Sequence, residues 1–133
     1  MENINYVDLE CFKGLFLEDS FVLQIIENPE LVSFQVEFVL IENHPEYKEP
    51  IGNEKYYYRF GEINFIKPKE VTWKFRNQKI LSIDANNEND LGNIDLFFKS
   101  GEYYSLEGDW GSLLIKCDNL KVKLQDFLTD GAD

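Results

Sequence analysis

The chain is poor in the residue types on which most catalytic and metal sites depend. Its 133 residues include one histidine, two cysteines and one methionine. A Ser–His or Cys–His catalytic pair would therefore have to use His44, which stands in a proline-containing acidic stretch. Cys11 and Cys117 lie near opposite ends of the sequence, which is not the ligand spacing of a tetrahedral zinc site. We expect a protein that is not an enzyme and that holds no metal or cofactor.

Proline, glycine and long apolar runs are also scarce. With 4 prolines and 8 glycines, the loops should be short. Apolar stretches such as residues 39–41 are far too short to cross a bilayer, and residues 1–5 lack the basic and apolar regions of a signal peptide. We therefore expect a cytoplasmic protein with no membrane contact. In that compartment two buried, reduced thiols are favoured over a disulfide.

Large apolar and aromatic side chains are abundant. Hydrophobic residues make up 44% of the chain and aromatic residues 15%, including 11 Phe and 7 Tyr. That content is too high for a disordered acidic chain, although the net charge is -12. A chain of this length also buries enough surface for an ordinary core. We expect a single folded domain over residues 1–133.

Alternation of apolar and polar residues predicts strands through most of the chain. Between Leu31 and Glu42 the apolar residues recur at every second position, which suits a strand and not a helix. Shorter patterns of the same kind predict strands at 20–26, 55–65, 71–75 and 80–83. A turn is expected at 28–30, and a loop at 43–54, where two prolines oppose regular structure.

Two glycines mark expected irregularities. Gly61 interrupts the pattern of 55–65, and we expect a bulge or a bend there. Residues 4–17 place aromatic and leucine side chains at steps of three and four, which predicts a short amphipathic helix. Gly14 should weaken or end that helix.

The last third of the chain predicts a meander. Two-residue polar turns at 100–101, 108–109 and 118–119 separate alternating segments, as in tight hairpins. The four strands so defined are 94–99, 103–107, 110–117 and 120–125. The whole pattern indicates a mainly β protein: one antiparallel domain of about eight or nine strands, barrel-like or a sandwich, that ends in this meander.

The negative charge is concentrated in the first two-fifths of the chain. Residues 1–54 carry 12 acidic and 2 basic residues, a net charge of -10, whereas residues 55–133 carry 13 and 11, a net charge of -2. Such a field repels nucleic acids and anionic membranes and speeds encounter with a basic partner. Base stacking on the aromatic residues would also need a basic groove, which an acidic chain does not predict.

Acidic and aromatic residues around the 43–54 loop are the candidate contacts. Consecutive strand residues face opposite sides, so at least one of the three tyrosines 56–58 should point away from the core. The candidate binding residues are Glu37, Glu42, Glu46, Glu49 and Glu54, with Tyr56 or Tyr57 as an anchor. An acidic surface that serves solubility alone is the competing interpretation.

A run of oxygen-bearing side chains follows the first half of a calcium-loop pattern. Asp84, Asn86, Glu88 and Asp90 occupy alternate positions. However, Asn89 stands where such loops need glycine, and the flanking residues predict strands instead of helices. We expect a solvated loop without a metal.

Three segments carry a resemblance to a known group of proteins. Residues 19–25, 108–113 and 120–122 resemble those of small bacterial β-rich proteins, among which are polymorphic-toxin immunity families. The resemblance spans about 19–124 as a pattern and implies a cytoplasmic protein that binds and blocks a cognate toxin. The charge asymmetry of the chain favours a basic one. It implies no particular contact residues. Exposed edge strands leave both a monomer and a homodimer open.

The length also resembles that of intracellular lipid-binding barrels. Those proteins bind a carboxylate through an Arg-x-Tyr pair near the C-terminus. Here the arginines are Arg59 and Arg76, and the last strand reads Val122-Lys123-Leu124, so that pair is absent. A barrel that binds a small apolar ligand within an aromatic-lined pocket is the second functional hypothesis.

Overall fold

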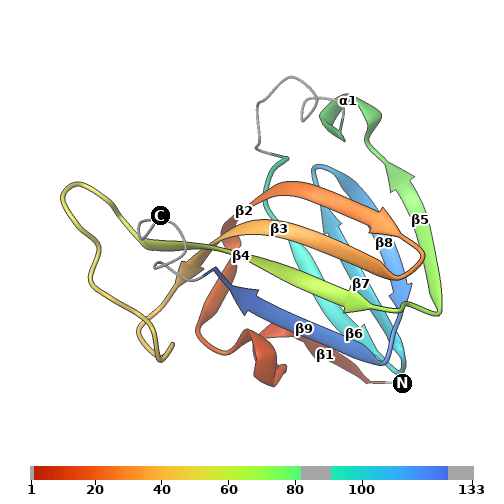
Figure 1. Cartoon of the computed structure of the whole chain (residues 1–133), viewed down its shortest axis with the longest axis horizontal. Helices are drawn as coiled ribbons and strands as arrows, with labels where there is room; N and C mark the ends of the chain where they lie inside the picture. Colours follow the sequence, from red (N-terminus) through yellow and green to blue (C-terminus); the bar gives the residue numbers. More distant parts are fainter. Residues whose placement is uncertain (1, 82–90, 126–133) are drawn as a thin grey trace.

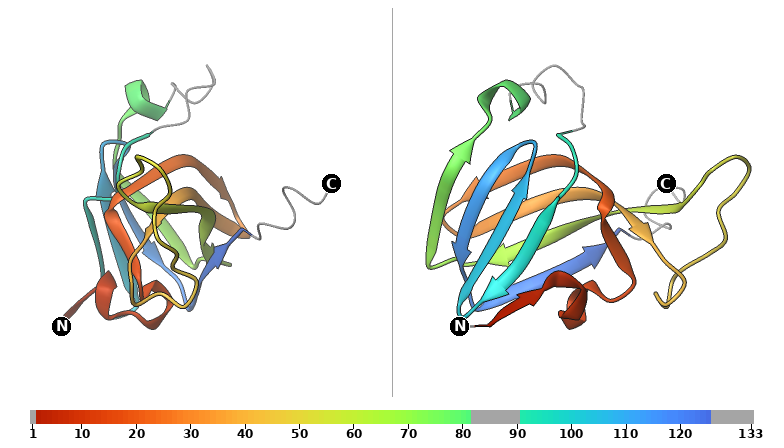
Figure 2. Two further views of the ribbon diagram at one scale, coloured as in Figure 1. Left: turned by 90° about the vertical axis from the view of Figure 1, so that its left-hand side faces the viewer. Right: turned by 180° about the vertical axis from the view of Figure 1, so that it is seen from behind.

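The computed structural model describes residues 2–81 and 91–125 (Figure 1). Within these ranges nine strands form two antiparallel sheets, of order β1-β6-β7-β8-β5 and β2-β3-β4-β9. Figure 2 shows the sheets as two layers. The strands are β1 (Asn3–Asn5), β2 (Leu15–Asn28), β3 (Leu31–Leu40), β4 (Tyr57–Ile66), β5 (Glu70–Arg76), β6 (Leu96–Ser100), β7 (Tyr103–Gly108), β8 (Gly111–Lys116) and β9 (Asn119–Leu124). The expected mainly β, antiparallel fold is confirmed in the form of a sandwich, and the described strands do not close into a barrel.

The alternation of β3 determines which of its faces is buried. Phe34, Val36 and Phe38 point between the sheets and are almost completely buried, as their spacing of two residues predicts. Gln35 and Glu37 point to the other face and are partly exposed. Each large apolar side chain removed from water in this way contributes about 1.5–3 kcal/mol to the hydrophobic stabilisation.

Aromatic rings from both layers fill the space between the sheets. Phe34 on β3 meets Trp110 edge-to-face at 5.2 Å, and Phe65 on β4 contacts Tyr104 and Phe97 of the opposite sheet at 5.5 and 6.1 Å. The indole N–H of Trp110 donates to the carbonyl of Asn93, so its one polar group is satisfied. Rings from both sheets therefore belong to one continuous core.

The N-terminal segment contains two short helical turns where the sequence predicts one helix. They are η1 (Tyr6–Asp8) and η2 (Glu10–Phe12), and both lie on the core through Tyr6 and Phe12. Gly14 ends the helical stretch, as expected, with φ +80°, and a Cβ there would collide with the backbone of His44. β2 begins at the next residue.

The expected four-stranded meander is wrong at its last strand. β6, β7 and β8 are consecutive neighbours in one sheet, but β9 crosses to the other sheet and pairs with β4. Leu120, Val122 and Leu124 then add to the core from the same layer as β3. The sequence pattern correctly predicted that β9 is a strand, but alternation does not determine the strand with which it pairs.

Gly61 does not introduce a bulge. The β3–β4 register runs without a shift from Leu31–Ile66 to Leu40–Tyr57. Glycine is required here by close packing instead: a Cβ would collide with the carbonyl oxygen of Lys123 on β9 and lie 2.9 Å from the ring of Phe38.

Two further expectations are corrected. Residues 78–81 form a single helical turn, α1 (Gln78–Leu81), instead of the start of a strand, and the rest of 80–83 lies outside the described residues. The calcium-like run 84–90 also lies outside them. Cys117 is buried as expected, whereas Cys11 is exposed, and the two are not joined in a disulfide.

Candidate functional site

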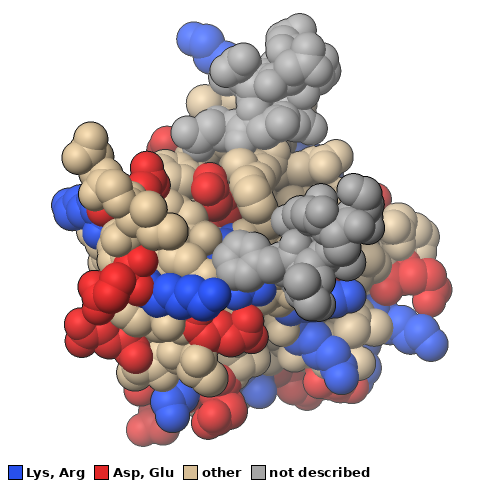
Figure 3. All heavy atoms as spheres, turned by 60° about the vertical axis from the view of Figure 1, so that its left-hand side comes forward, with Lys and Arg blue, Asp and Glu red and all other residues tan. Residues whose placement is uncertain are grey.

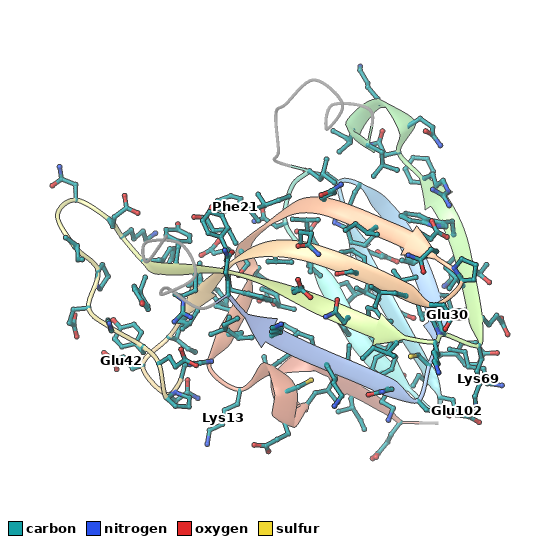
Figure 4. All side chains as sticks on the ribbon, in the orientation of Figure 1. Lys13, Phe21, Glu30, Glu42, Lys69 and Glu102 are labelled. Atoms are coloured by element: carbon teal, nitrogen blue, oxygen red, sulfur yellow. The ribbon has the colours of Figure 1, made fainter. Side chains whose placement is uncertain are left out.

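The acidic residues of the N-terminal stretch are divided between opposite ends of the sandwich. β2 and β3 form a hairpin that spans the molecule, so its tip carries Glu30 and its base leads to Glu42 (Figure 4). Glu27, near the tip, pairs with Arg76 of β5 at 2.9 Å. A run of like charge in sequence therefore does not form one surface in space.

The end opposite the hairpin tip is built around the loop between β3 and β4. This loop, residues 41–56, projects beyond both sheets (Figure 1). It is fixed at its base, where Ile41 N–H donates to the carbonyl of Gly14. His44 is half-buried there: burial lowers the pKa of its imidazole, and Nδ1 accepts from the backbone N–H of Glu46. Through this hydrogen bond the imidazole of His44 stabilises the loop.

Glu46 has a second role in holding the loop. Its carboxylate lies 2.9 Å from the guanidinium of Arg59, which is buried with 7% of its side chain exposed. Arg59 also donates to the carbonyl of Gln125 at 2.5 Å. A buried guanidinium needs such partners because its desolvation is costly. Glu46 is thus engaged with its own chain, and Glu49 stands exposed farther along the loop.

Three of the candidate residues line a cavity beneath the loop. Glu42, Tyr56 and Tyr57 border a space of about 460 Å³, to which Tyr47 also contributes. The rings of Tyr47 and Tyr57 meet edge-to-face at 6.2 Å. The hydroxyl of Tyr57 is buried and has no hydrogen-bond partner among the described residues.

The other two candidate glutamates, Glu37 and Glu54, act electrostatically on Tyr58, as does Asp19. The pKa of Tyr58 is raised first by burial and then by the charges of Glu37 and Glu54, with Tyr56 and Asp19 adding to the effect. Asp19 also accepts a hydrogen bond of 2.6 Å from the hydroxyl of Tyr56. Carboxylates from β2, β3 and the loop therefore lie in the same region of the surface.

Aromatic rings surround these carboxylates on the outer face of the four-stranded sheet. Phe21 and Tyr58 stack at 6.2 Å, and Tyr58 meets Tyr56 edge-to-face at 6.1 Å. Phe60 follows on the same side of β4 and is 48% exposed. Val39 also points to this outer face, between Phe16 and Tyr58 on the neighbouring strands, yet it is completely buried.

We call this surface the acidic–aromatic face. It comprises Asp19, Phe21, Glu37, Glu54, Tyr56, Tyr58 and Phe60. Sequence reasoning identified Glu37, Glu54 and Tyr56 but not the other four. The shared parity of Tyr56, Tyr58 and Phe60 was a usable signal, because a strand that buries one parity exposes the other. Phe21 could be added only from the β2–β3 register.

The end of the molecule that carries this face is mixed in charge. Figure 3, in which the loop end comes forward, shows lysine and arginine side chains among the acidic ones. Lys55 lies over the ring of Tyr56, 5.2 Å from its centre. The local excess of acid is therefore moderate, and it lies beside partly exposed rings.

Comparisons with protein-family models, curated proteins and solved structures give no match to this chain. Helices in the described ranges are all too short to span a bilayer. No group of three or more His, Cys, Asp or Glu residues suited to a metal ion occurs among residues 2–81 and 91–125. Functional inference therefore starts from the geometry of the site.

Proposed function

We propose that the protein is a non-enzymatic binding module that recognises a basic protein partner through the acidic–aromatic face. The observation that carries this proposal is a set of carboxylates beside partly exposed aromatic rings. Asp19 accepts a hydrogen bond from Tyr56, and Glu37 lies opposite Phe21 and Phe60 in the strand register. If the resemblance to immunity proteins holds, the partner is a basic toxin and the module is its inhibitor.

The aromatic residues of the face support this proposal. Aromatic side chains are enriched in the residues that dominate binding energy, and exposed rings supply contact area at a small entropic cost. Carboxylates beside them accelerate encounter with a basic surface and select against acidic ones. The two kinds of residue therefore have complementary roles in one site.

The same observation counts against the interpretation that the acidic residues serve solubility alone. Charges that serve solubility alone have no reason to gather around exposed rings, which themselves lower solubility. Phe60 and Tyr58 point away from a core that is already filled by other rings. The exposure of Phe60 favours an interface.

The test combines capture with association kinetics. The protein is immobilised, partners are captured from lysate of the native host, and the association rate with the purified partner is measured across salt concentrations. A basic partner should associate about tenfold or more slowly as salt screens the charges. A combined Asp19→Asn, Glu37→Gln and Glu54→Gln variant should lose most of that salt dependence. A partner that is not basic, or an association rate that ignores salt, contradicts the proposal.

The matched control removes the same number of charges elsewhere. Glu10, Glu30 and Glu107 are exposed and lie outside the acidic–aromatic face. Replacing all three by glutamine changes the net charge by the same amount. If this control loses as much salt dependence as the site variant, the total charge and not the face governs association.

Binding of a small molecule is the second candidate, on one specific observation. A cavity of about 600 Å³ lies on the four-stranded sheet, lined in part by Leu23, Phe60 and Leu124. Its volume falls within the range of small-molecule sites. Native mass spectrometry of freshly purified protein tests this candidate: a co-purifying ligand that the bulky variant Leu23→Trp excludes would support it, and ligand-free protein would count against it.

A further inference from the structure

We propose that His44 is a pH-sensitive latch at the base of the loop 41–56: the neutral imidazole closes the turn 44–47, and the protonated imidazole opens that turn and loosens the loop. This inference goes beyond the proposed function, because it assigns a regulatory role to a residue outside the acidic–aromatic face. His44 is the one histidine of the chain, so its titration can be followed directly.

The latch is a turn that the imidazole closes. The backbone carbonyl of His44 accepts from the N–H of Tyr47 at 3.1 Å, and Nδ1 of the same residue accepts from the N–H of Glu46 at 2.9 Å. Pro45 suits the second position of such a turn. The first position favours Asn, Asp or Ser, whose side chains accept from the N–H two residues further on. His44 makes the same bond with a nitrogen that can be protonated.

The turn is attached to the sandwich at the same residue. The N–H of His44 donates to the carbonyl of Ile41, whose own N–H donates to the carbonyl of Gly14. A Cβ at Gly14 would collide with Cβ and the backbone of His44, so the two residues are in close contact. A change at the imidazole therefore acts at the base of the loop, where the loop meets the start of β2.

Protonation removes the acceptor on which this turn depends. A neutral imidazole carries its proton on one nitrogen, and the hydrogen bond from Glu46 requires that this nitrogen be Nε2. In the imidazolium ion both nitrogens are donors. The N–H at Nδ1 would then face the backbone N–H of Glu46, so the two donors would repel each other and the turn would lose its side-chain bond.

Charged groups around His44 act on it in both directions. Burial has the largest effect and lowers the pKa of the imidazole, while the Glu46 carboxylate raises it and the Arg59 guanidinium of β4 lowers it. Glu46 lies 2.9 Å from Arg59, so the two charges partly offset each other. Tyr47, the other titratable residue of the turn, has a raised pKa and remains neutral at acid pH. The balance favours the neutral imidazole while the turn is closed.

The sign of the pH effect follows from that balance. With the turn open, His44 titrates near its ordinary pKa of about 6.5, whereas with the turn closed its pKa is lower. Above about pH 6.5 the imidazole is neutral in both states, and the latch makes its full contribution. As the pH falls below this value, the open state binds the proton first. The ratio of open to closed turn therefore rises by up to about tenfold per pH unit.

Opening of the turn would loosen one wall of the neighbouring cavity. The loop supplies Glu42, Tyr47 and Pro50 to the cavity of about 460 Å³, whereas the opposite wall includes Tyr57 of β4. The ion pair between Glu46 and the buried Arg59 remains as a second attachment of the loop. Acidification should therefore loosen the base of the loop and leave both sheets folded.

The imidazole nitrogen signals of the full chain, followed by NMR across pH, give the first test. At neutral pH they should show the proton on Nε2 and a bare Nδ1, and the titration should give a pKa below about 6.5. This measurement needs no substitution. A proton on Nδ1 at neutral pH, or a pKa at or above the ordinary value, overturns the inference.

Hydrogen exchange of the backbone N–H of Glu46 gives the second test. It is measured by NMR at about pH 7.5 and about pH 5 and is corrected for the intrinsic effect of pH on exchange. Protection of this N–H should decrease by about 3- to 30-fold at the lower pH, because the open turn gains population over that interval. Equal protection at the two pH values overturns the inference.

The matched variant is His44→Asn, because asparagine keeps a side-chain acceptor for the N–H of Glu46 and cannot be protonated. Its Glu46 N–H should be protected equally at both pH values. His44→Ala lacks the acceptor and should show the low protection at both. A loss of protection at about pH 5 that is as large in His44→Asn as in the native protein overturns the inference, because another group would then titrate. Circular dichroism verifies that each variant is folded.

Discussion

Replacing Tyr6 by phenylalanine should destabilise the protein at neutral pH and make it less sensitive to alkali. The Tyr6 hydroxyl donates to Glu18 at 2.5 Å and accepts from the backbone N–H of Leu17 at 3.0 Å. Glu18 is exposed and can turn to water, but Leu17 is completely buried. A buried N–H left without an acceptor costs about 1–3 kcal/mol. With the lost bond to Glu18, we expect a decrease of about 2–3 kcal/mol in the free energy of unfolding.

At alkaline pH the substitution acts in the opposite direction, because it removes a contribution that lowers the stability of the unsubstituted protein. Burial, followed by the hydrogen bond to Glu18, raises the pKa of Tyr6 well above its ordinary value of about 10. Below that value both the folded and the unfolded chain keep the phenol proton. Above it the unfolded chain loses the proton while the folded chain retains it, so stability falls by up to about 1.4 kcal/mol per pH unit from this group. Tyr6→Phe removes that contribution, and the other tyrosines are common to both proteins.

Urea unfolding followed by tryptophan fluorescence measures both effects. At pH 7 the variant should unfold at lower urea, and a thermal melt should shift by about 7–11 °C. From about pH 9 to about pH 11 the gap between the two proteins should narrow. The control is Tyr103→Phe, because its hydroxyl donates to Glu70 on an exposed surface and should contribute little. Equal stability at pH 7, or a gap that stays constant up to pH 11, would refute the reasoning.

Three further outcomes are expected. Gly61→Ala should lower the free energy of unfolding by about 2 kcal/mol or more, because its methyl group collides with the backbone of β9, and urea unfolding checks this. Glu46→Gln should lower it by about 1–2 kcal/mol, between the values for surface and buried ion pairs, because Arg59 is buried and its partner is half-exposed. The same urea titration measures this loss, which should shrink in high salt. Cys11 should react with a thiol reagent in the native state and Cys117 only after unfolding, as mass spectrometry of the labelled protein would reveal.

The sequence predicted the elements that a local pattern determines. The period of two in residues 34–40 correctly identified the buried face of β3, and polar turns correctly separated β6, β7 and β8. It was unable to predict the partner of β9, because its alternation of Leu120, Val122 and Leu124 is compatible with either sheet. The short apolar run at 80–81 was equally compatible with a strand and a helical turn.

The candidate site was also only partly predictable from the sequence. The parity of Tyr56, Tyr58 and Phe60 was visible in the sequence, and Glu37 followed from its charge. The position of Phe21 opposite Glu37 was not visible in the sequence, because it depends on the β2–β3 register, which shifts on both sides of that pair. The role of Glu46 was also hidden, because nothing local indicates that Arg59 would be buried and would need a carboxylate.

The crossing of β9 to the second sheet has a consequence for folding. Its pairing with β4 joins residues roughly sixty positions apart, and strands β5 to β8 all lie within the loop so closed. Pairing of β9 with β4 therefore closes a long loop, and contacts of such long range slow folding. We expect one cooperative unfolding transition, with neither sheet stable without the other.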